Sequence, residues 1–562
     1  MTLDVHAAAV TFSDGTEVEF SPSAVTFIVG ANNSGKSRAL HDLAAGLVGA
    51  GQGVMVVHAV RRAGAGGPAI KRWLEDRGLL KIDRFGNTVL AGNSMIGGVP
   101  AVGMPGVLSL TEAIVQLPST GPLGFIAPML VQVLGAGERL ASVMTQQSFD
   151  PAYGQPTSPM QMLQAFPELE QQLSSAAEAA FGRTITLNRV AGPNLRLHVG
   201  RPLREPDLLD AGYAEEIASL PSVEEQGDGY KAFIGIMMSV LVAQARILLI
   251  DEPEAFLHPP QARRLGREIA SRVDDGTQAF IATHSSDVLE GALQAGVDVN
   301  VLRITREGAV NRPTMLNTAA LRDLWADPLL RYSGALDALF ARGLVLCENE
   351  RDCTFYLAVL DEDEDAPSDH DLEFATVGGK GAIPRVAAAI AALGVPVRAI
   401  CDIDVLNDEL LLDRIVSSLG GSLSEDMRRD LRVIDSAVRG MAETPTVDDL
   451  REQLTARLEA NEGDQISRQT WNDLQQLTRK PGGWKRLKQG GVALLRGNQH
   501  EAATRLIAGL REQGLYVVDK GELEGWVPDA GGKGPDWLPR AFEKGGHLRP
   551  EVRAFVRPLA EI

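Results

Sequence analysis

Short apolar runs that end in glycine or in acidic residues recur along the chain and set its expected order of elements. In the N-terminal half, Val25–Val29 has the pattern of a strand that ends at Gly30, and the segment after Lys36 has helical spacing. Further on, the apolar pattern predicts helix, strand, helix and strand over residues 230–243, 246–250, 260–273 and 278–283. This alternation is typical of a largely parallel sheet covered by helices.

A second series of strands follows in the C-terminal half. The pattern predicts them at Gly343–Cys347, 373–377, 397–401 and Leu515–Val518, with a polar, mostly helical insertion over residues 407–513. We therefore expect two domains, at residues 1–325 and 336–562. Residues 63–200 are irregular apart from helices near 160–181, and we expect an inserted region there. The sequence leaves its role open, with dimerisation as one candidate.

Composition narrows the class of protein. The 562 residues carry 54 Lys and Arg against 73 Asp and Glu, a formal charge of −19, so any contact with nucleic acid requires a local basic patch. The 3 cysteines show no metal-binding spacing and are too few for a disulfide framework. No apolar run is long enough to cross a membrane, and no secretory signal is recognisable. We expect a cytoplasmic protein.

The loop after the first strand has the residues of a phosphate-binding loop. Its backbone N–H groups can face phosphates at the positive end of the following helix. Lys36 is expected to reach the β- and γ-phosphates, and the Ser37 hydroxyl to bind Mg²⁺. Asp251, at the end of an apolar strand, is expected to hold the same ion, and Glu252 to activate the attacking water. The candidate ATP-binding residues of the loop are Gly30, Asn32, Asn33, Ser34, Gly35, Lys36 and Ser37.

These segments resemble the ABC and SMC-like ATPases. The resemblance rests on DEPEAFLHP from Asp251 and on FIATHSSDVL, in which His284 is implied to sense the γ-phosphate. EQGDGY at residues 225–230 is implied to be the signature loop, with Gly227 and Gly229 facing a nucleotide on a partner subunit. An ordinary turn capped by Asp228 is the alternative. The resemblance implies a homodimer or a higher homo-oligomer.

Acidic residues follow the strands of the C-terminal half. Glu348 and Asp352 lie four residues apart, which places them on one face of a helix, and Asp402 and Asp404 share one direction if their strand continues. Clustered carboxylates suit Mg²⁺ or Mn²⁺, and two ions about 4 Å apart activate water against a phosphodiester. Solvated polar ends of strands and helices are the alternative interpretation.

This arrangement resembles a TOPRIM domain, with Glu at one strand end and Asp-x-Asp at another. VGGKG at residues 377–381 and GLYVVDKGELE at 514–524 extend the resemblance to the OLD (overcoming lysogenization defect) family of ATPase–TOPRIM nucleases. It implies an α/β fold in which an ABC-type head precedes the TOPRIM domain. By the same resemblance, Lys520 stabilises charge in the transition state, and Glu522 and Glu524 help to bind metal. Asn349 departs from the glycine common at its position, which puts the local metal geometry in question.

A basic stretch without acids lies in the helical insertion and is the candidate DNA contact. Basic side chains around an aromatic suit phosphate contacts and base stacking, whereas a solvated loop over a packed Trp484 is the alternative. The candidate residues are Arg479, Lys480, Lys485, Arg486, Lys488 and Arg496 around Trp484.

Together these features predict an ATP-governed DNA endonuclease or nickase. The implied catalytic residues are Glu252, His284, Glu348, Asp402 and Lys520. Similarity to Gabija-type and retron-associated nucleases implies anti-phage defence, with a helicase or a reverse transcriptase as a candidate partner. Two alternatives stay open: an ATP-gated DNA clamp whose TOPRIM module does not cleave, and a TOPRIM ribonuclease. No recognisable domain presents a strand-attacking tyrosine, so hydrolysis by water is preferred to topoisomerase chemistry.

Overall fold

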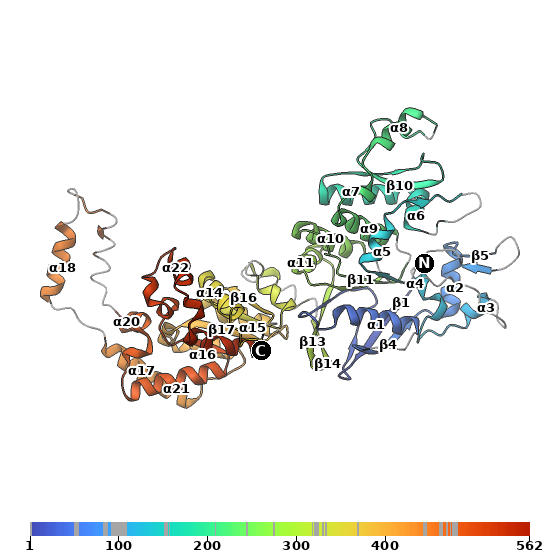
Figure 1. The fold of residues 1–562 in the computed structure, drawn as a ribbon. Helices are drawn as coiled ribbons and strands as arrows, with labels where there is room; N and C mark the ends of the chain where they lie inside the picture. The colour runs from blue at the N-terminus through green and yellow to red at the C-terminus, as the bar shows by residue number, and fades with distance from the viewer. Residues whose placement is uncertain are drawn as a thin grey trace. The chain divides into compact units, whose positions relative to one another are not determined.

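The computed structural model divides the chain into two compact units, Met1–Asp327 and Pro328–Ile562 (Figure 1). Each unit has its own sheets and its own core. The residues that the structure describes are 3–49, 55–82, 88–90, 110–150, 156, 158–207, 209–242, 245–273, 276–316, 319, 325–328, 331, 334–367, 370–441, 447–459, 465–467, 470–471, 474 and 482–561.

Unit 1 is built on a six-stranded sheet with the strand order β14-β13-β3-β12-β11-β7. All neighbouring strands are parallel except β13 and β14. The strands are β3 (Val25–Val29), β7 (Val131–Leu134), β11 (Ile247–Asp251), β12 (Gln278–Ala282), β13 (Val299–Glu307) and β14 (Val310–Leu316). The main helices are α1 (Lys36–Val48), α9 (Asp228–Val242), α10 (Pro259–Arg272) and α11 (Ser286–Gln294). The α/β class expected from the sequence is confirmed.

The region expected as an insertion at 63–200 contributes to the central sheet, which corrects that interpretation. Its strand β7 pairs in parallel with β11, with Val131 opposite Ile247. The helix α5 (Ala136–Ser142) follows β7 directly and packs against α9. The same region also holds α2 (Gly67–Asp76), α3 (Leu110–Val115), α4 (Ala127–Leu130), α6 (Pro159–Ala165), α7 (Pro167–Phe181), β9 (Ile185–Asn188) and β10 (Asn194–Val199).

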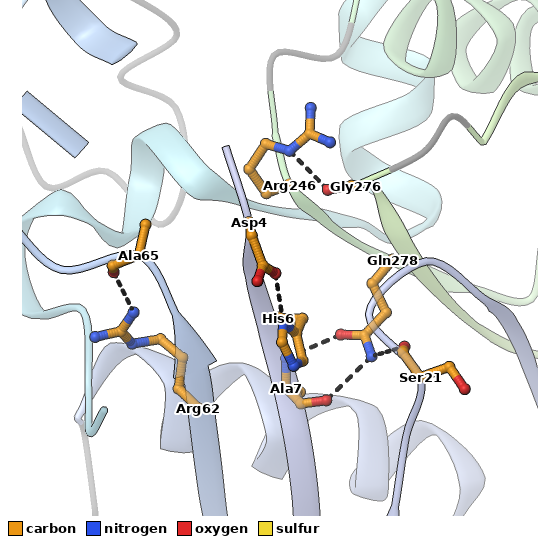
Figure 2. Close-up of polar contacts among 9 residues, drawn as sticks. All are labelled: Asp4, His6, Ala7, Ser21, Arg62, Ala65, Arg246, Gly276 and Gln278. Atoms are coloured by element: carbon orange, nitrogen blue, oxygen red, sulfur yellow. Dashed lines mark hydrogen bonds and ion pairs between the residues drawn. The ribbon is translucent and has the colours of Figure 1, made fainter. Parts of the chain in front are cut away.

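A small antiparallel sheet, in the order β2-β1-β4, shares one hydrophobic core with α1 and the central sheet. Its strands are β1 (Val5–Phe12), β2 (Glu17–Glu19) and β4 (Val57–Gly64). The fully buried Gln278 of β12 joins this sheet to the central one. Its amide oxygen accepts from the Ala7 N–H at 2.9 Å, and its amide nitrogen donates to the carbonyls of Ala7 and Ser21 at 3.0 Å each (Figure 2). One side chain thus satisfies three backbone groups.

Unit 2 is built on a four-stranded, fully parallel sheet in the order β16-β15-β17-β18. The strands are β15 (Gly343–Cys347), β16 (Leu372–Thr376), β17 (Val397–Asp402) and β18 (Leu515–Val518). Buried Trp526, Trp537 and Phe555 fill the core on one side. Because the strands are parallel, the loops after all four meet at one edge of the sheet.

The insertion between β17 and β18 is helical, as expected. It contains α16 (Glu409–Ser418), α17 (Glu425–Gly440), α18 (Val447–Glu459), α20 (Gly483–Gly490) and α21 (Asn498–Glu512). The helices α17 and α21 pack side by side in Figure 1. Across the described part of the chain, we find no helix long and apolar enough to cross a bilayer.

Candidate functional site

The loop between β3 and α1 has the backbone of a phosphate-binding loop. Gly30 has φ +144°, and a Cβ atom there would lie 2.2 Å from the carbonyl oxygen of Ile304, so only glycine fits. Gly35 is the N-cap of α1 with φ +97°. The helix therefore starts at Lys36, as the sequence predicts, and its free N–H groups point into the loop.

Lys36 folds back onto this loop. Its Nζ donates to the carbonyl oxygens of Gly30 at 2.7 Å and of Ala31 at 2.9 Å, and the residue is 3% exposed. Within hydrogen-bond reach of the loop, the ammonium group is placed to meet phosphates that bind there.

Asp251, the last residue of β11, lies next to Ser37 in the first turn of α1. Burial raises the pKa of its carboxyl group, a hydrogen bond from Ser37 lowers it, and the charge of Glu252 raises it again. Its buried Oδ1 has no hydrogen-bond partner among the described residues. An unsatisfied carboxylate oxygen beside a serine hydroxyl fits Mg²⁺, which prefers such hard ligands, so Ser37 and Asp251 are the residues that would hold it.

Glu252 and His284 meet at the ends of β11 and β12. The Nε2 atom of His284 lies 3.4 Å from Oε1 of Glu252. Glu252 has φ +46°, a conformation that non-glycine residues rarely adopt. Both predicted catalytic side chains of the ATP site therefore lie together, just after two adjacent parallel strands.

Two further residues of this site, Glu254 and Arg139, were not predicted from the sequence. Glu254 accepts from the His284 N–H at 2.7 Å and from the Thr283 hydroxyl at 2.8 Å, and so joins the two strand ends. Arg139 of α5 is 1% exposed and donates to the Glu252 carbonyl at 2.8 Å. The Arg139 bond holds the backbone of Glu252 in its unusual conformation.

The two glycines of the expected signature loop lie at the start of α9. A Cβ at Gly229 would lie 2.3 Å from the Phe256 carbonyl oxygen, whereas Gly227 has open space around it. Asp228 is the first residue of α9 and pairs with Lys231 at 2.7 Å. Gly229 is thus required for packing inside this unit, and Gly227 is free to approach a ligand.

The acidic residues of unit 2 converge at the carboxyl edge of its sheet. Glu348 follows β15, Asp402 ends β17, and Asp404 comes shortly after it. One carboxylate oxygen from each of these three residues lies within 4.8 Å of the others. Glu348 also accepts from the Asp402 N–H at 3.1 Å. Burial, together with the neighbouring Asp402 carboxylate, raises the pKa of Glu348.

Two details of the local geometry differ from the simplest reading of the sequence. The strand does not continue past Asp402, because Asp404 lies in the 3₁₀ helix η5 (Ile403–Asn407), and the tight turn brings the two side chains together. Glu348 precedes α14 (Glu350–Asp361) and shares no helical face with Asp352. Asn349 takes the N-cap position because its side chain accepts from the first turn of the helix.

Asp352 belongs to this capping box rather than to the group of three. Its carboxylate accepts from the Asn349 side-chain amide at 2.8 Å and from the Asn349 N–H at 3.3 Å. Burial, with the charges of Asp402 and Glu348, raises the pKa of Asp352 to about 7. Asn349 therefore preserves an acid next to the cluster and orients it.

The loop after β18 places Lys520, Glu522 and Glu524 around one open cavity of about 590 Å³. The Lys533 ammonium pairs with Glu522 at 2.5 Å, and Ile403 N–H donates to the Gly521 carbonyl at 2.9 Å. The latter bond ties this loop to η5, beside the carboxylates.

The predicted basic patch separates into parts. Lys488 does not face solvent with the rest: its Nζ lies 2.7 Å from Asp402 Oδ2 and 3.3 Å from Asp404 Oδ2. The assignment of Lys488 to a DNA contact is therefore corrected. Its ammonium group pairs with Asp402 and Asp404, which are distant in the sequence. Lys485, Arg486 and Arg496 are exposed, whereas Arg479 and Lys480 lie outside the described residues.

Trp484 is half-buried against α17. Its indole N–H donates to Asp435 Oδ1 at 3.3 Å. This contact supports the alternative in which the tryptophan packs beneath the basic side chains.

The chemistry of the acidic cluster fits divalent metal. Glu348, Asp402 and Asp404 supply three carboxylates within the spacing that one ion can bridge, and Asp352, Glu522 and Glu524 lie close by. Hard oxygen donors of this kind suit Mg²⁺ or Mn²⁺.

Comparison with known proteins matches each unit to a family model. Residues 178–290 match the model described as "AAA domain, putative AbiEii toxin, Type IV TA system". Residues 339–404 match "Overcoming lysogenization defect protein-like, TOPRIM domain". The chain thus carries a match to an AAA domain, followed by a match to an OLD-like TOPRIM domain. The OLD-like match ends at Asp404, so it contains Glu348, Asp402 and Asp404 as well as the neighbouring Asp352.

Among curated proteins, the chain is similar to the Old nuclease of Escherichia phage P2. The two are 25% identical over 180 residues, which cover 30% of this chain and 29% of the phage protein. The matched part thus spans less than a third of that relative.

Solved SMC heads are also similar. The SMC head domain from Thermotoga maritima is 14% identical with a TM-score of 0.30, over 56% of this chain and 100% of that one. An SMC head bound to the C-terminal winged-helix domain of ScpA is 14% identical with a TM-score of 0.33, over 56% of this chain and 98% of that one.

Proposed function

We propose that this protein is an ATP-dependent, Mg²⁺- or Mn²⁺-dependent DNA endonuclease or nickase. The observation that carries the proposal is the convergence of Glu348, Asp402 and Asp404 within 4.8 Å at the carboxyl edge of a TOPRIM sheet. The similarity to Old nuclease supports the nuclease class. The phosphate loop in the same chain supplies nucleotide control.

In the ATPase unit, each side chain has a distinct task. Lys36 binds the phosphates, Ser37 and Asp251 hold Mg²⁺, and Glu252 accepts the proton of the attacking water. His284, 3.4 Å from Glu252, is placed to contact the γ-phosphate beside that water. Gly227, with open space around it, suits contact with a nucleotide on a second subunit, so we propose a homodimer.

In the TOPRIM unit, the carboxylates would position a divalent ion and its activated water for cleavage of the phosphodiester. A divalent ion bound here would activate water and stabilise the leaving oxygen. Glu348, Asp402 and Asp404 would hold it, Asp352 adjusts the local charge, and Glu522 and Glu524 extend the acidic surface. Lys520 lines the adjoining cavity, where its cation can meet a substrate phosphate.

The helical insertion supplies the DNA contact in this proposal. Lys485, Arg486 and Arg496 are exposed, although the whole chain is acidic. A cavity of about 660 Å³ between α17 and α21 adds Arg429 and Arg432. Reversing the charges of Lys485, Arg486 and Arg496 should weaken DNA binding and flatten its salt dependence. Unchanged binding would place the DNA elsewhere.

A plasmid-nicking assay tests the proposed activity. The protein is incubated with supercoiled plasmid, ATP and Mg²⁺ or Mn²⁺, and compared with Asp402→Ala and with the control Lys544→Ala, which changes an exposed lysine outside the proposed DNA contact. We expect nicked or linear product from the wild type and the control, and none from Asp402→Ala. Equal cleavage by all three would show that the acidic cluster does not cut DNA.

One observation favours the alternative of an ATP-gated clamp that does not cleave. Asp402 and Asp404 are ion-paired with Lys488 and Lys380, which neutralises much of their charge. Absence of nicking under every metal and nucleotide condition, with DNA binding retained, would favour the clamp.

The biological role we propose is anti-phage defence in the cytoplasm. It is supported by similarity to a phage Old nuclease and by the Gabija-type and retron-associated resemblance of the sequence. A helicase or a reverse transcriptase encoded nearby is the proposed partner. Plaque assays with wild-type and Asp402→Ala genes test the role.

A further inference from the structure

A lysine contacts two of the three carboxylates of the acidic cluster. Lys488 Nζ contacts one oxygen of Asp402 at 2.7 Å and one of Asp404 at 3.3 Å. Lys380 contacts the other oxygen of Asp404 at 2.8 Å. The side chains of Lys488 and Asp402 are 23% and 15% exposed, so the pair is largely withdrawn from water.

The backbone fixes Lys488 in this position. A Cβ atom at Gly521 would lie 2.1 Å from the Lys488 carbonyl oxygen, and one at Gly491 would lie 2.3 Å from the Asp519 carbonyl oxygen. The Val492 N–H donates to that same Asp519 carbonyl at 2.9 Å. The C-terminal end of α20 is thus fitted directly against the loop that follows β18.

The other end of α20 is fixed in the same way. A Cβ at Gly483 would lie 1.8 Å from the Val438 carbonyl oxygen of α17. Leu487 is fully buried between these two contacts. The helix is therefore held at both ends by contacts that only glycine permits, and Lys488 points at the carboxylates as a consequence of packing.

An ammonium group and a divalent ion require the same oxygens. Carboxylate oxygens that accept a charge-assisted hydrogen bond have to lose it before they coordinate metal fully. Two positive charges a few ångströms apart also repel strongly in a partly buried site. Lys488 and a metal ion shared by Asp402 and Asp404 therefore compete.

We propose that Lys488 is a resident counter-cation of the nuclease site, which divalent metal displaces when it binds Asp402 and Asp404. The inference rests on the proposed function, because it assumes that these carboxylates bind metal. Because Lys488 belongs to α20, the position of this helix in the insertion then determines how tightly the carboxylates bind metal. Lys488 thus acts as a positioning residue whose ammonium keeps the carboxylates neutralised until metal arrives.

Titration of the full chain with MnCl₂, without nucleotide, tests this proposal by calorimetry. Lys488→Met keeps the length and apolar stem of the side chain and removes its charge. We expect it to lower the Kd for Mn²⁺ about tenfold, the factor for one charge-assisted hydrogen bond that no longer has to be broken. Lys488→Arg should keep the wild-type Kd, as should Lys485→Met, which alters an exposed lysine of the same helix.

The outcomes separate this inference from the proposed function. An equal or weaker Mn²⁺ affinity in Lys488→Met would overturn the role of Lys488, while the metal site would stand. Mn²⁺ binding that persists unchanged in Asp402→Ala would instead overturn the proposed metal site itself. If Lys488→Met does not fold, as judged by circular dichroism, Lys488→Gln serves in its place, with the same expected direction.

Discussion

Asp352 provides a quantitative test of how crowded the acidic cluster is. Its pKa lies at about 7 against an ordinary value of 3.8, because of burial first and then the charges of Asp402 and Glu348. The folded state thus holds the proton more tightly than the unfolded chain does. The free energy of unfolding should therefore fall as pH rises from about 4 to about 7, and the loss is complete above that range.

Asp352→Asn removes this penalty and keeps an oxygen that can accept from Asn349. The rise in the pKa of Asp352 from 3.8 to about 7, at about 1.4 kcal/mol for each pH unit, sets an upper limit of ~4 kcal/mol for the gain at pH 8. Relaxation of the site reduces this gain. We expect Asp352→Asn to raise the free energy of unfolding by about 2 kcal/mol at pH 8 and by little at pH 4.

Urea unfolding in EDTA at both pH values, followed by tryptophan fluorescence, measures this difference. Trp526 and Trp537 are buried in the same core and report on unit 2. Glu350→Gln, an exposed acid in the first turn of the same helix, is the matched control. A gain for Asp352→Asn that is equal at both pH values, or no larger than that of the control, would refute the reasoning.

Four further predictions concern the ATPase unit. Lys36→Ala should abolish tight ATP binding, because it removes the cation in the loop, and fluorescent-nucleotide titration checks this; wild-type affinity would contradict it. Glu252→Gln should keep ATP bound and stall phosphate release, and normal hydrolysis would mean that Glu252 is not the base. Arg139→Met should lower kcat about tenfold or more with KM nearly unchanged, because the Glu252 backbone loses its 2.8 Å donor, whereas a change confined to KM would argue against this role. Gln278→Leu should destabilise unit 1 by about 2–4 kcal/mol, since three backbone groups lose a buried partner, and thermal unfolding within error of wild type would contradict it.

The parts of the fold that followed from the sequence are those set by local pattern. Strands β3, β15 and β18 have the predicted bounds because each is a run of apolar residues closed by a glycine or a charged residue. The residues after such strands in a parallel sheet share one edge, so Glu348 and Asp402 meet as expected.

The parts that did not follow depend on partners far away in the sequence. The four-residue strand β7 forms a strand because it pairs with β11, which lies more than a hundred positions later in the sequence. Arg139 shows no local signal, because its role is a hydrogen bond to Glu252. Lys488 resembles its exposed neighbours in sequence, and only the packing of α20 on the loop after β18 turns it toward Asp402.

In the proposed mechanism, the TOPRIM carboxylates hold metal directly against the phosphate that is cut. Sulfur substitution at that phosphate tests the contact, because Mg²⁺ binds sulfur poorly and Mn²⁺ binds it better. Cleavage of phosphorothioate-containing plasmid is compared with cleavage of ordinary plasmid under each metal. We predict a much larger loss of cleavage rate from sulfur with Mg²⁺ than with Mn²⁺. An equal loss with both metals would contradict direct contact between the metal and the scissile phosphate.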